Sequence, residues 1–316
     1  MGNEETTPEA NARDGGSATG MQLAVGCAAA LTASICWAGN FIAGRGLADL
    51  VPPMTLVILR GVLGVLFLLP FAARQLRRDW PQVVAHWRYF ALSGFLGLTV
   101  PYSTIYMAAH STNALNMSII AITTPLFMLL LARIVYSEHL TYMRLAGLGV
   151  VICGILVLIS KGDIAVLAGL RFAPGDLLML VNAMCFASYT VLLRKSPKIG
   201  GLSFLAVFMF AGTLFTLPGA VWEIASGGRI FFTAKFVGGL LYVVIGATLV
   251  AIGCWNLAIQ KIGLAKSSIL YYTLPLFSGL GGMIFLDEPV LTVHFISMAL
   301  VITGLLIALR AGEPKQ

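Results

Sequence analysis

Residues 54–73 read MTLVILRGVLGVLFLLPFAA, and this stretch decides the fold class of the chain. Arg60 is the one formal charge in it, and the apolar run is continuous rather than alternating with polar positions. A helix needs about 20 apolar residues to cross the roughly 30 Å hydrocarbon core of a membrane. A membrane-spanning strand would instead alternate with a period of two. The stretch therefore predicts a transmembrane helix.

The composition of the whole chain points the same way. Of its 316 residues 59% are hydrophobic and only 10% are charged, and the mean hydropathy is +0.92. A soluble domain carries about 25% charged residues, so a soluble enzyme, a nucleic-acid-binding module and a disordered regulator are excluded. The net charge of +7 arises from short basic clusters between apolar runs, as at the flanks of membrane helices. We expect a lipid bilayer around the protein and no nucleic acid.

Ten apolar runs follow one another along the chain, separated by short linkers. They cover residues 23–46, 54–73, 89–109, 114–134, 143–160, 176–194, 203–222, 236–259, 266–286 and 291–310. With a cytoplasmic N-terminus, fourteen Lys and Arg residues lie on the inner side and five on the outer side. The positive-inside rule therefore places both termini in the cytoplasm. Residues 1–20 lack the basic region of a signal peptide, so we expect a disordered cytoplasmic tail there and a second tail at 311–316.

The second half of the sequence repeats the first at an offset of 149 or 150 residues. The matches include Pro125-Leu126-Phe127 with Pro275-Leu276-Phe277, Glu138 with Glu288, Arg45 with Arg194, and Tyr106 with Trp255. Each copy, 21–160 and 173–310, holds five expected spans. Because five is odd, the second copy must enter the membrane upside down. The fold class predicted is all-α integral membrane, with ten transmembrane helices as two inverted five-helix repeats.

Inverted repeats of this kind are a transporter architecture, with the substrate site near the midplane at the repeat interface. A duplicated bundle with another task is the alternative. The repeat therefore favours transmembrane transport of a small solute by alternating access.

Several motifs of this chain resemble the EamA family, a branch of the drug/metabolite transporter superfamily. They are Trp37-Ala38-Gly39-Asn40-Phe41, Leu59-Arg60-Gly61, Thr124-Pro125-Leu126-Phe127 followed by Glu138, Gly175-Asp176-Leu177-Leu178, and Pro275-Leu276-Phe277 followed by Leu286-Asp287-Glu288-Pro289. The resemblance covers residues 22–310. It implies a bacterial inner-membrane permease, often an exporter of amino acids or related metabolites, in a family whose members differ widely in cargo.

Arg60 is the first candidate for a role in solute binding. An arginine inside a span costs roughly 2.5–3.5 kcal/mol on insertion scales, so it needs a partner or a wet cavity. Either it lines the cavity and attracts a carboxylate, or it is a structural arginine bonded to the carbonyls of a neighbouring helix. Trp37 and Asn40 share one face of their helix, and the buried amide is either interhelical glue or a substrate contact.

Aromatic residues with a polar group suit a cavity that binds an amphipathic solute, although some belong instead to interfacial belts. The further candidates for substrate contact are Tyr102, Tyr106, Ser188, Tyr189, Trp255, Asn256, Tyr271 and Tyr272. Pro125 and Pro275 occupy equivalent positions and are either gate hinges or part of the bundle geometry.

The motifs of other protein classes are missing from the sequence. No zinc-protease, serine-hydrolase or phosphate-loop motif occurs, and the five cysteines form no CxxC pair. We therefore expect neither an enzyme nor a cofactor or metal. A carrier of phosphorylated or sugar-nucleotide solutes is the alternative within transport, and would want two or more basic groups at cavity depth. A polytopic membrane enzyme or sensor is the alternative from another class.

Overall fold

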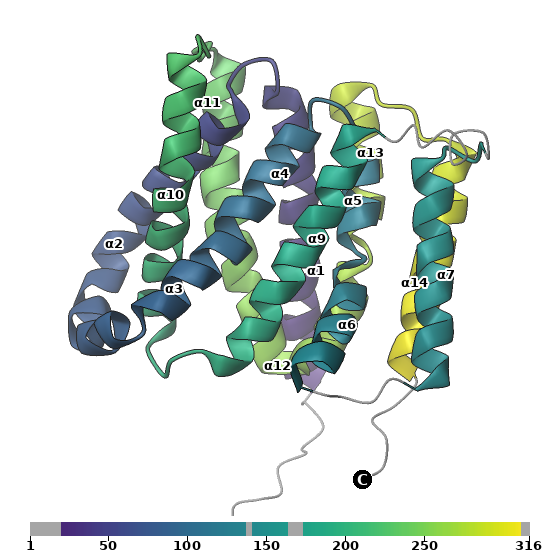
Figure 1. Cartoon of the computed structure of the whole chain (residues 1–316), viewed down its shortest axis with the longest axis horizontal. Helices are drawn as coiled ribbons and strands as arrows, with labels where there is room; N and C mark the ends of the chain where they lie inside the picture. The colour runs from purple at the N-terminus through teal and green to yellow at the C-terminus, as the bar shows by residue number, and fades with distance from the viewer. Residues whose placement is uncertain (1–19, 137–140, 164–172, 311–316) are drawn as a thin grey trace, which may run out of the picture.

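The computed structural model describes residues 20–136, 141–163 and 173–310, and over these residues all regular structure is helical (Figure 1). The first half holds α1 (Gly20–Leu47), α2 (Pro53–Ala85), α3 (Trp87–Gly94), η1 (Phe95–Thr99), α4 (Val100–Ala108), α5 (Ala114–Ala121), α6 (Thr124–Tyr136) and α7 (Tyr142–Ile159). The second half holds α9 (Pro174–Leu192), η2 (Leu193–Lys195), α10 (Gly201–Ala225), α11 (Ala234–Leu241), η3 (Tyr242–Val250), α12 (Ala251–Tyr271), α13 (Leu274–Leu286) and α14 (Thr292–Arg310). The expected tails 1–20 and 311–316 lie outside the described residues, apart from Gly20.

The helices have the length and composition of membrane spans. Six stretches are long and apolar enough to cross a membrane: Gly20–Leu47, Pro53–Ala85, Ala114–Val135, Pro174–Leu192, Gly201–Ala225 and Ala234–Ile262. Three shorter apolar helices are Leu145–Leu158, Leu274–Leu286 and Thr292–Ile307. A helix satisfies its backbone hydrogen bonds internally, as a hydrocarbon environment requires. Over its described residues, the chain therefore has the structure of an all-helical membrane protein.

Two of the sequence-based boundaries differ from the structure. Helix α2 continues to Ala85, well past the expected end at residue 73, because residues 74–79 add polar helix-forming residues to an uninterrupted helix. The expected linker between 236–259 and 266–286 has helical backbone, since α12 is helical throughout. The chain nevertheless reverses direction within α12, because the rings of Trp255 and Tyr271 lie 5.8 Å apart whereas 16 residues of straight helix would span about 24 Å. A further break follows at Tyr272 and Thr273.

Both proline-centred motifs follow a helix break. Between α5 and α6 the Thr123 hydroxyl donates to the carbonyl of Ile120 at 2.6 Å, and Pro125 lies in the first turn of α6. Between α12 and α13 the Thr273 hydroxyl donates to the carbonyl of Leu270 at 2.6 Å, and Pro275 lies in the first turn of α13. Proline fits a first turn because that N–H has no helical partner. The two prolines therefore begin helices rather than kink them.

Helices α2 and α10 pack along their length and cap one another. At the start of α2, Glu223 of α10 accepts hydrogen bonds from the backbone N–H groups of Met54 (2.9 Å) and Thr55 (2.8 Å). At the start of α10, Gln75 of α2 accepts from the N–H of Ser203 at 3.1 Å. The capping residues Gln75 and Glu223 are 148 positions apart, as are the capped residues Thr55 and Ser203. One contact thus occurs twice, once at each end of the helix pair.

A second cap strengthens the start of α10. The Asp79 carboxylate accepts from the Gly200 N–H at 2.9 Å and from the Ser203 hydroxyl at 2.8 Å. A carboxylate at a helix N-terminus meets both the free N–H groups and the positive end of the helix dipole.

The remaining long helices form three further groups. Helix α1 packs on α12 and α13, and α9 packs on α4, α5 and α6. Helices α7 and α14 pair with each other and stand at one side of the bundle in Figure 1, where the Ser297 hydroxyl donates to the Gly154 carbonyl at 2.7 Å. Helix α1 begins and α14 ends at the same end of the bundle (Figure 1).

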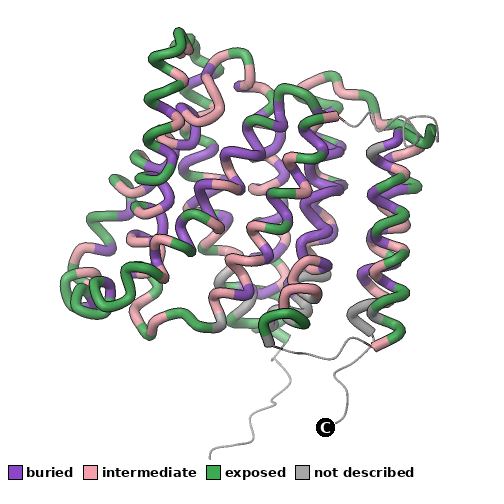
Figure 2. The backbone as a smooth tube through the Cα atoms, viewed as in Figure 1, coloured by how far each residue is buried: buried purple, intermediate pink, exposed green. Residues whose placement is uncertain are grey.

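Buried residues concentrate in the central helices (Figure 2). Every residue of α5 is buried, whereas large apolar side chains such as Phe71, Trp222 and Phe285 are 70% exposed or more. In water such side chains would form aggregation-prone patches. In a membrane they face lipid, and the interior of the bundle is the part that can hold a polar site.

Candidate functional site

Arg60 lies inside the bundle with its charge directed at neutral groups. Its Nη1 donates to the Tyr106 hydroxyl at 2.8 Å and, at 3.5 Å, approaches the Asn40 side-chain oxygen. Its Nη2 donates to the Thr248 hydroxyl at 2.6 Å. The guanidinium carbon also lies 3.4 Å from the centre of the Tyr102 ring. The side chain is 1% exposed, so α1, α2, α4 and η3 together enclose it.

The hydroxyl groups around Arg60 are oriented by their own acceptors. Tyr106 donates to the Asn40 oxygen at 3.0 Å, and Thr248 donates to the carbonyl of Val243 at 2.8 Å. Each hydroxyl proton therefore points away from the guanidinium, and the oxygen lone pairs are free to accept from it. The π-type segment η3 helps to orient the Thr248 hydroxyl, because the carbonyl that accepts its proton lies five residues earlier in the same segment.

No carboxylate of the described residues pairs with Arg60. The ion pairs of Arg45 with Glu288 and of Arg78 with Asp79 do not involve it. A buried charge is expensive unless it is paired, and here dipoles and an aromatic face stabilise it in place of a counter-ion. The arrangement leaves a positive charge in the interior that an anionic group of a solute can neutralise.

Three aromatic side chains form a second cluster nearby. The ring centres of Trp37 and Trp255 lie 5.4 Å apart, those of Trp37 and Tyr271 5.7 Å, and those of Trp255 and Tyr271 5.8 Å. These tilted and edge-on arrangements are favourable for aromatic pairs. The cluster joins α1 to both ends of α12.

Tyr102 stacks on the guanidinium of Arg60 with one ring face. A further aromatic pair is Tyr189 and Phe208, whose ring centres lie 5.0 Å apart. Gly97 makes room for Tyr189, because a Cβ there would lie 2.6 Å from the Tyr189 ring. The region therefore has a cationic centre with aromatic surfaces beside it.

The structure brings most of the residues expected from the sequence into this region. Asn40, Arg60, Tyr102 and Tyr106 surround the cation, while Trp37, Trp255, Tyr271 and Tyr189 supply the aromatic surfaces. Ser188 is not part of either group, since its hydroxyl donates to Met184 of its own helix at 2.9 Å. Tyr272 is 5% exposed, and its hydroxyl has no hydrogen-bond partner among the described residues. The side chain of Asn256 lies outside the described residues.

Sequence reasoning missed two residues of the region. Thr248 completes the contacts of Arg60. Its signal in the sequence is the repeat offset, because Thr248 follows Thr99 by 149 residues. Each of these two threonines lies in a π-type segment, η1 or η3. Phe208 occupies the position that corresponds to Arg60 at an offset of 148, which makes the two halves of the site different: one cationic, one aromatic.

An ion pair joins the two halves of the chain at one end of the bundle. Arg45, in the last turn of α1, lies 3.3 Å from Glu288, which follows α13. Arg45 also donates to the carbonyl of Ala109 at 2.6 Å, and Glu288 accepts from the N–H of Ala114 at 3.0 Å. The pair therefore ties together the ends of α1, α4, α5 and α13. No cluster of His, Cys, Asp and Glu that could hold a metal ion occurs among the described residues.

A membrane bundle with an internal cation beside aromatic rings is an arrangement that a solute transporter can use. The sequence profile of the EamA-like transporter family matches residues 24–160 and again residues 173–310. The chain belongs to this family, which confirms the resemblance found in its motifs. Its relatives are named as transporters, and the protein is a membrane transport protein rather than an enzyme.

Individual relatives cover most of the chain. The uncharacterized transporter YyaM of Bacillus subtilis is 26% identical over 235 residues, 69% of this chain and 72% of the relative. A probable terminal-alkyne amino-acid exporter of Streptantibioticus cattleyicolor is 27% identical over 280 residues, 86% of this chain and 85% of the relative. A protein of known crystal structure shares the fold, with a TM-score of 0.61 and 20% sequence identity. The match covers 90% of this chain and 96% of the chain in that crystal structure.

Proposed function

We propose that this protein exports a small amphipathic solute that carries a carboxylate, such as an amino acid or a related metabolite, across a bacterial inner membrane. The observation that carries the proposal is the buried guanidinium of Arg60, which has no carboxylate partner among the described residues. When a solute carboxylate reaches Arg60, the guanidinium exchanges its neutral hydrogen-bond partners for a group of opposite charge. Such a pair is strong in a water-poor interior.

The apolar part of the solute has aromatic surfaces to contact. Trp37, Trp255 and Tyr271 form one, and Tyr189 with Phe208 forms another. A zwitterion with an apolar side chain matches a single cation flanked by aromatic rings. The S. cattleyicolor relative, named as a probable amino-acid exporter, supports the same class of solute. A polyanion suits the site less well, because Arg60 is the only buried Arg or Lys whose side chain the structure describes.

We infer that transport uses alternating access between two inverted five-helix repeats, with both termini cytoplasmic. Contacts that occur once in each half support this topology. The reciprocal caps of α2 and α10 lie at opposite ends of the pair, as a two-fold axis in the membrane plane requires. The threonine–proline breaks and the π-type segments η1 and η3 recur at matching positions as well.

The ion pair of Arg45 and Glu288 is the closure of the outer side in this proposal. It joins the end of α1 in the first repeat to the segment after α13 in the second. Opening the outer side separates these elements and breaks the pair. Since Arg45 is 40% exposed at its side chain, water can replace its contacts, and the pair is weak enough to open and close.

A thermal-shift screen of the detergent-purified protein tests the class of solute. A ligand of the folded state raises the melting temperature in proportion to its occupancy. We expect shifts with apolar and aromatic amino acids in the wild type and none in Arg60→Met. Shifts confined to phosphorylated solutes would overturn the proposal in favour of the phosphorylated-solute carrier.

A further inference from the structure

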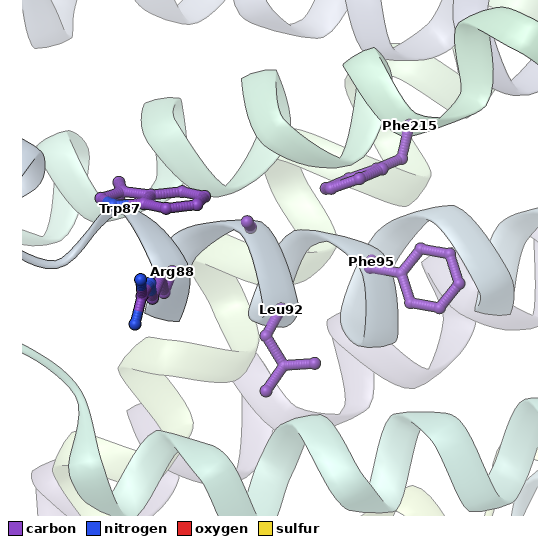
Figure 3. Close-up of a pocket in the computed structure, with 6 residues that line it drawn as sticks. Trp87, Arg88, Leu92, Phe95 and Phe215 are labelled. Atoms are coloured by element: carbon purple, nitrogen blue, oxygen red, sulfur yellow. The ribbon is translucent and has the colours of Figure 1, made fainter.

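An open apolar groove runs along the outside of the bundle between α3, η1 and α10 (Figure 3). It holds about 420 Å³ and is lined by Trp87, Arg88, Ala91, Leu92, Phe95 and Phe215. Trp87 and Arg88 lie at one end of the groove, and Phe95 and Phe215 lie at the other (Figure 3). The groove thus has one end that carries a charge and one that is wholly apolar.

Helices α3 and α10, which carry most of the groove lining, approach each other closely. A Cβ at Gly94 would lie 2.7 Å from the backbone nitrogen of Gly212, so glycine at both positions lets α3 and α10 touch. Phe95 and Phe215 close the apolar end, with ring centres 5.6 Å apart in an edge-on arrangement.

The residues of the groove wall are exposed although they are apolar. Trp87 is 61% exposed, Leu92 48% and Phe215 47%. In a membrane protein such a surface faces hydrocarbon chains rather than water. From residue 87 to residue 95 a helix rises about 12 Å, at 1.5 Å per residue, which is long enough to hold a substantial part of one acyl chain.

The charged end of the groove has the composition of a membrane interface. Arg88 is exposed, stacks on Trp87 with 5.6 Å from its guanidinium carbon to the ring, and has no carboxylate partner among the described residues. It lies in the first turn of α3, shortly after α2, whose last part carries Arg74, Arg77 and Arg78. Tryptophan at headgroup level and clustered arginines are the features that attract anionic lipid headgroups.

We propose that this groove is a binding site for one anionic glycerophospholipid. One acyl chain lies along Ala91, Leu92 and Phe95, and the headgroup phosphate pairs with Arg88. A lipid with a zwitterionic headgroup brings its own positive charge to the same place, so Arg88 favours the lipid with a net negative charge. The site lies on the lipid-facing surface, separate from the solute site around Arg60.

Quenching of tryptophan fluorescence by brominated lipids tests the proposal on the intact chain. The delipidated protein in detergent is titrated with dibrominated phosphatidylglycerol or dibrominated phosphatidylcholine, and the signal of the Trp87→Phe variant is subtracted to isolate Trp87. We expect saturable quenching at an about fivefold lower mole fraction of phosphatidylglycerol, the factor that corresponds to about 1 kcal/mol for one basic residue near an anionic surface.

Three variants separate the site from general surface charge. Arg88→Gln should remove the preference for phosphatidylglycerol, while the matched control Arg229→Gln, an exposed arginine in the segment before α11, should keep it. Ala91→Phe fills the groove without changing its charge or adding a tryptophan, and should weaken quenching by both lipids. Equal quenching by both lipids in the wild type, or an equal loss in Arg229→Gln and Arg88→Gln, would overturn the proposal.

Discussion

Replacing Arg60 by methionine distinguishes a structural arginine from one that binds solute. The substitution keeps a long side chain but removes the charge and its three hydrogen-bond contacts, to Asn40, Tyr106 and Thr248. No donor is orphaned, because Tyr106 still donates to Asn40 and Thr248 still donates to Val243. Methionine also avoids the cost of burying an unpaired charge.

The two contributions to stability are of similar size. Hydrogen bonds to a charged group contribute about 1.5–3 kcal/mol each, and desolvation of a buried ion costs several kcal/mol. We therefore expect the free energy of unfolding to change by no more than about 2 kcal/mol. Solute affinity behaves differently, because truncating one partner of a buried charge pair costs about 2–5 kcal/mol, which is an increase in Kd of about 30-fold or more.

The assay combines a thermal melt in detergent with direct binding of a labelled amino acid identified in the screen. Arg60→Lys is the matched control: it keeps the charge but loses the planar fork of donors, so its affinity should fall between those of the wild type and Arg60→Met. Binding of the amino acid by Arg60→Met with wild-type affinity would refute the role of Arg60 in solute binding. A loss of folding with intact affinity in the folded fraction would identify a structural arginine.

Three further changes test other parts of the structure. Glu223→Ala removes the cap of α2 and should lower the free energy of unfolding by about 1–3 kcal/mol in a thermal melt, whereas Trp222→Ala, on the lipid-facing surface, should change it far less; equal effects would contradict the cap. Arg45→Glu and Glu288→Arg should each slow transport in proteoliposomes, and the variant with both charges reversed should recover part of the rate. A double variant slower than both single variants would contradict the role of the ion pair in closing the outer side. Trp37→Ala should raise the Kd for solute about tenfold, and unchanged affinity would remove the aromatic cluster from the site.

The helices could be predicted from sequence because hydrophobicity over 20 residues is a strong signal. The positions where helices stop were harder. The second apolar run ends at residue 73, yet arginine is a good helix former and α2 continues to Ala85. Pro125 and Pro275 suggested gate hinges or a feature of the bundle geometry, and the structure places each in the first turn of a helix that follows a break at Thr123 or Thr273.

Part of the candidate site could also be predicted, because a charged or amide side chain inside an apolar run must face the interior of the bundle rather than lipid. Arg60 and Asn40 are such residues, and in the structure Nη1 of Arg60 lies 3.5 Å from Oδ1 of Asn40. Ser188 shows the limit of this reasoning, since a serine can satisfy its hydroxyl on its own helix. Glu223 and Asp79 could not be assigned from sequence, because the N-terminus that each one caps belongs to a helix more than 120 residues away.

Counterflow in proteoliposomes tests most directly whether the protein carries a solute through its carboxylate. Vesicles with purified protein are loaded with unlabelled phenylalanine and diluted into a trace of labelled phenylalanine, with phenylalanine or phenethylamine, which lacks the carboxylate, as competitor outside. The site around Arg60 predicts transient accumulation of label that excess phenylalanine abolishes and phenethylamine leaves unchanged, with no accumulation in Arg60→Met vesicles. Equal competition by phenethylamine, or accumulation undiminished in Arg60→Met vesicles, would contradict it.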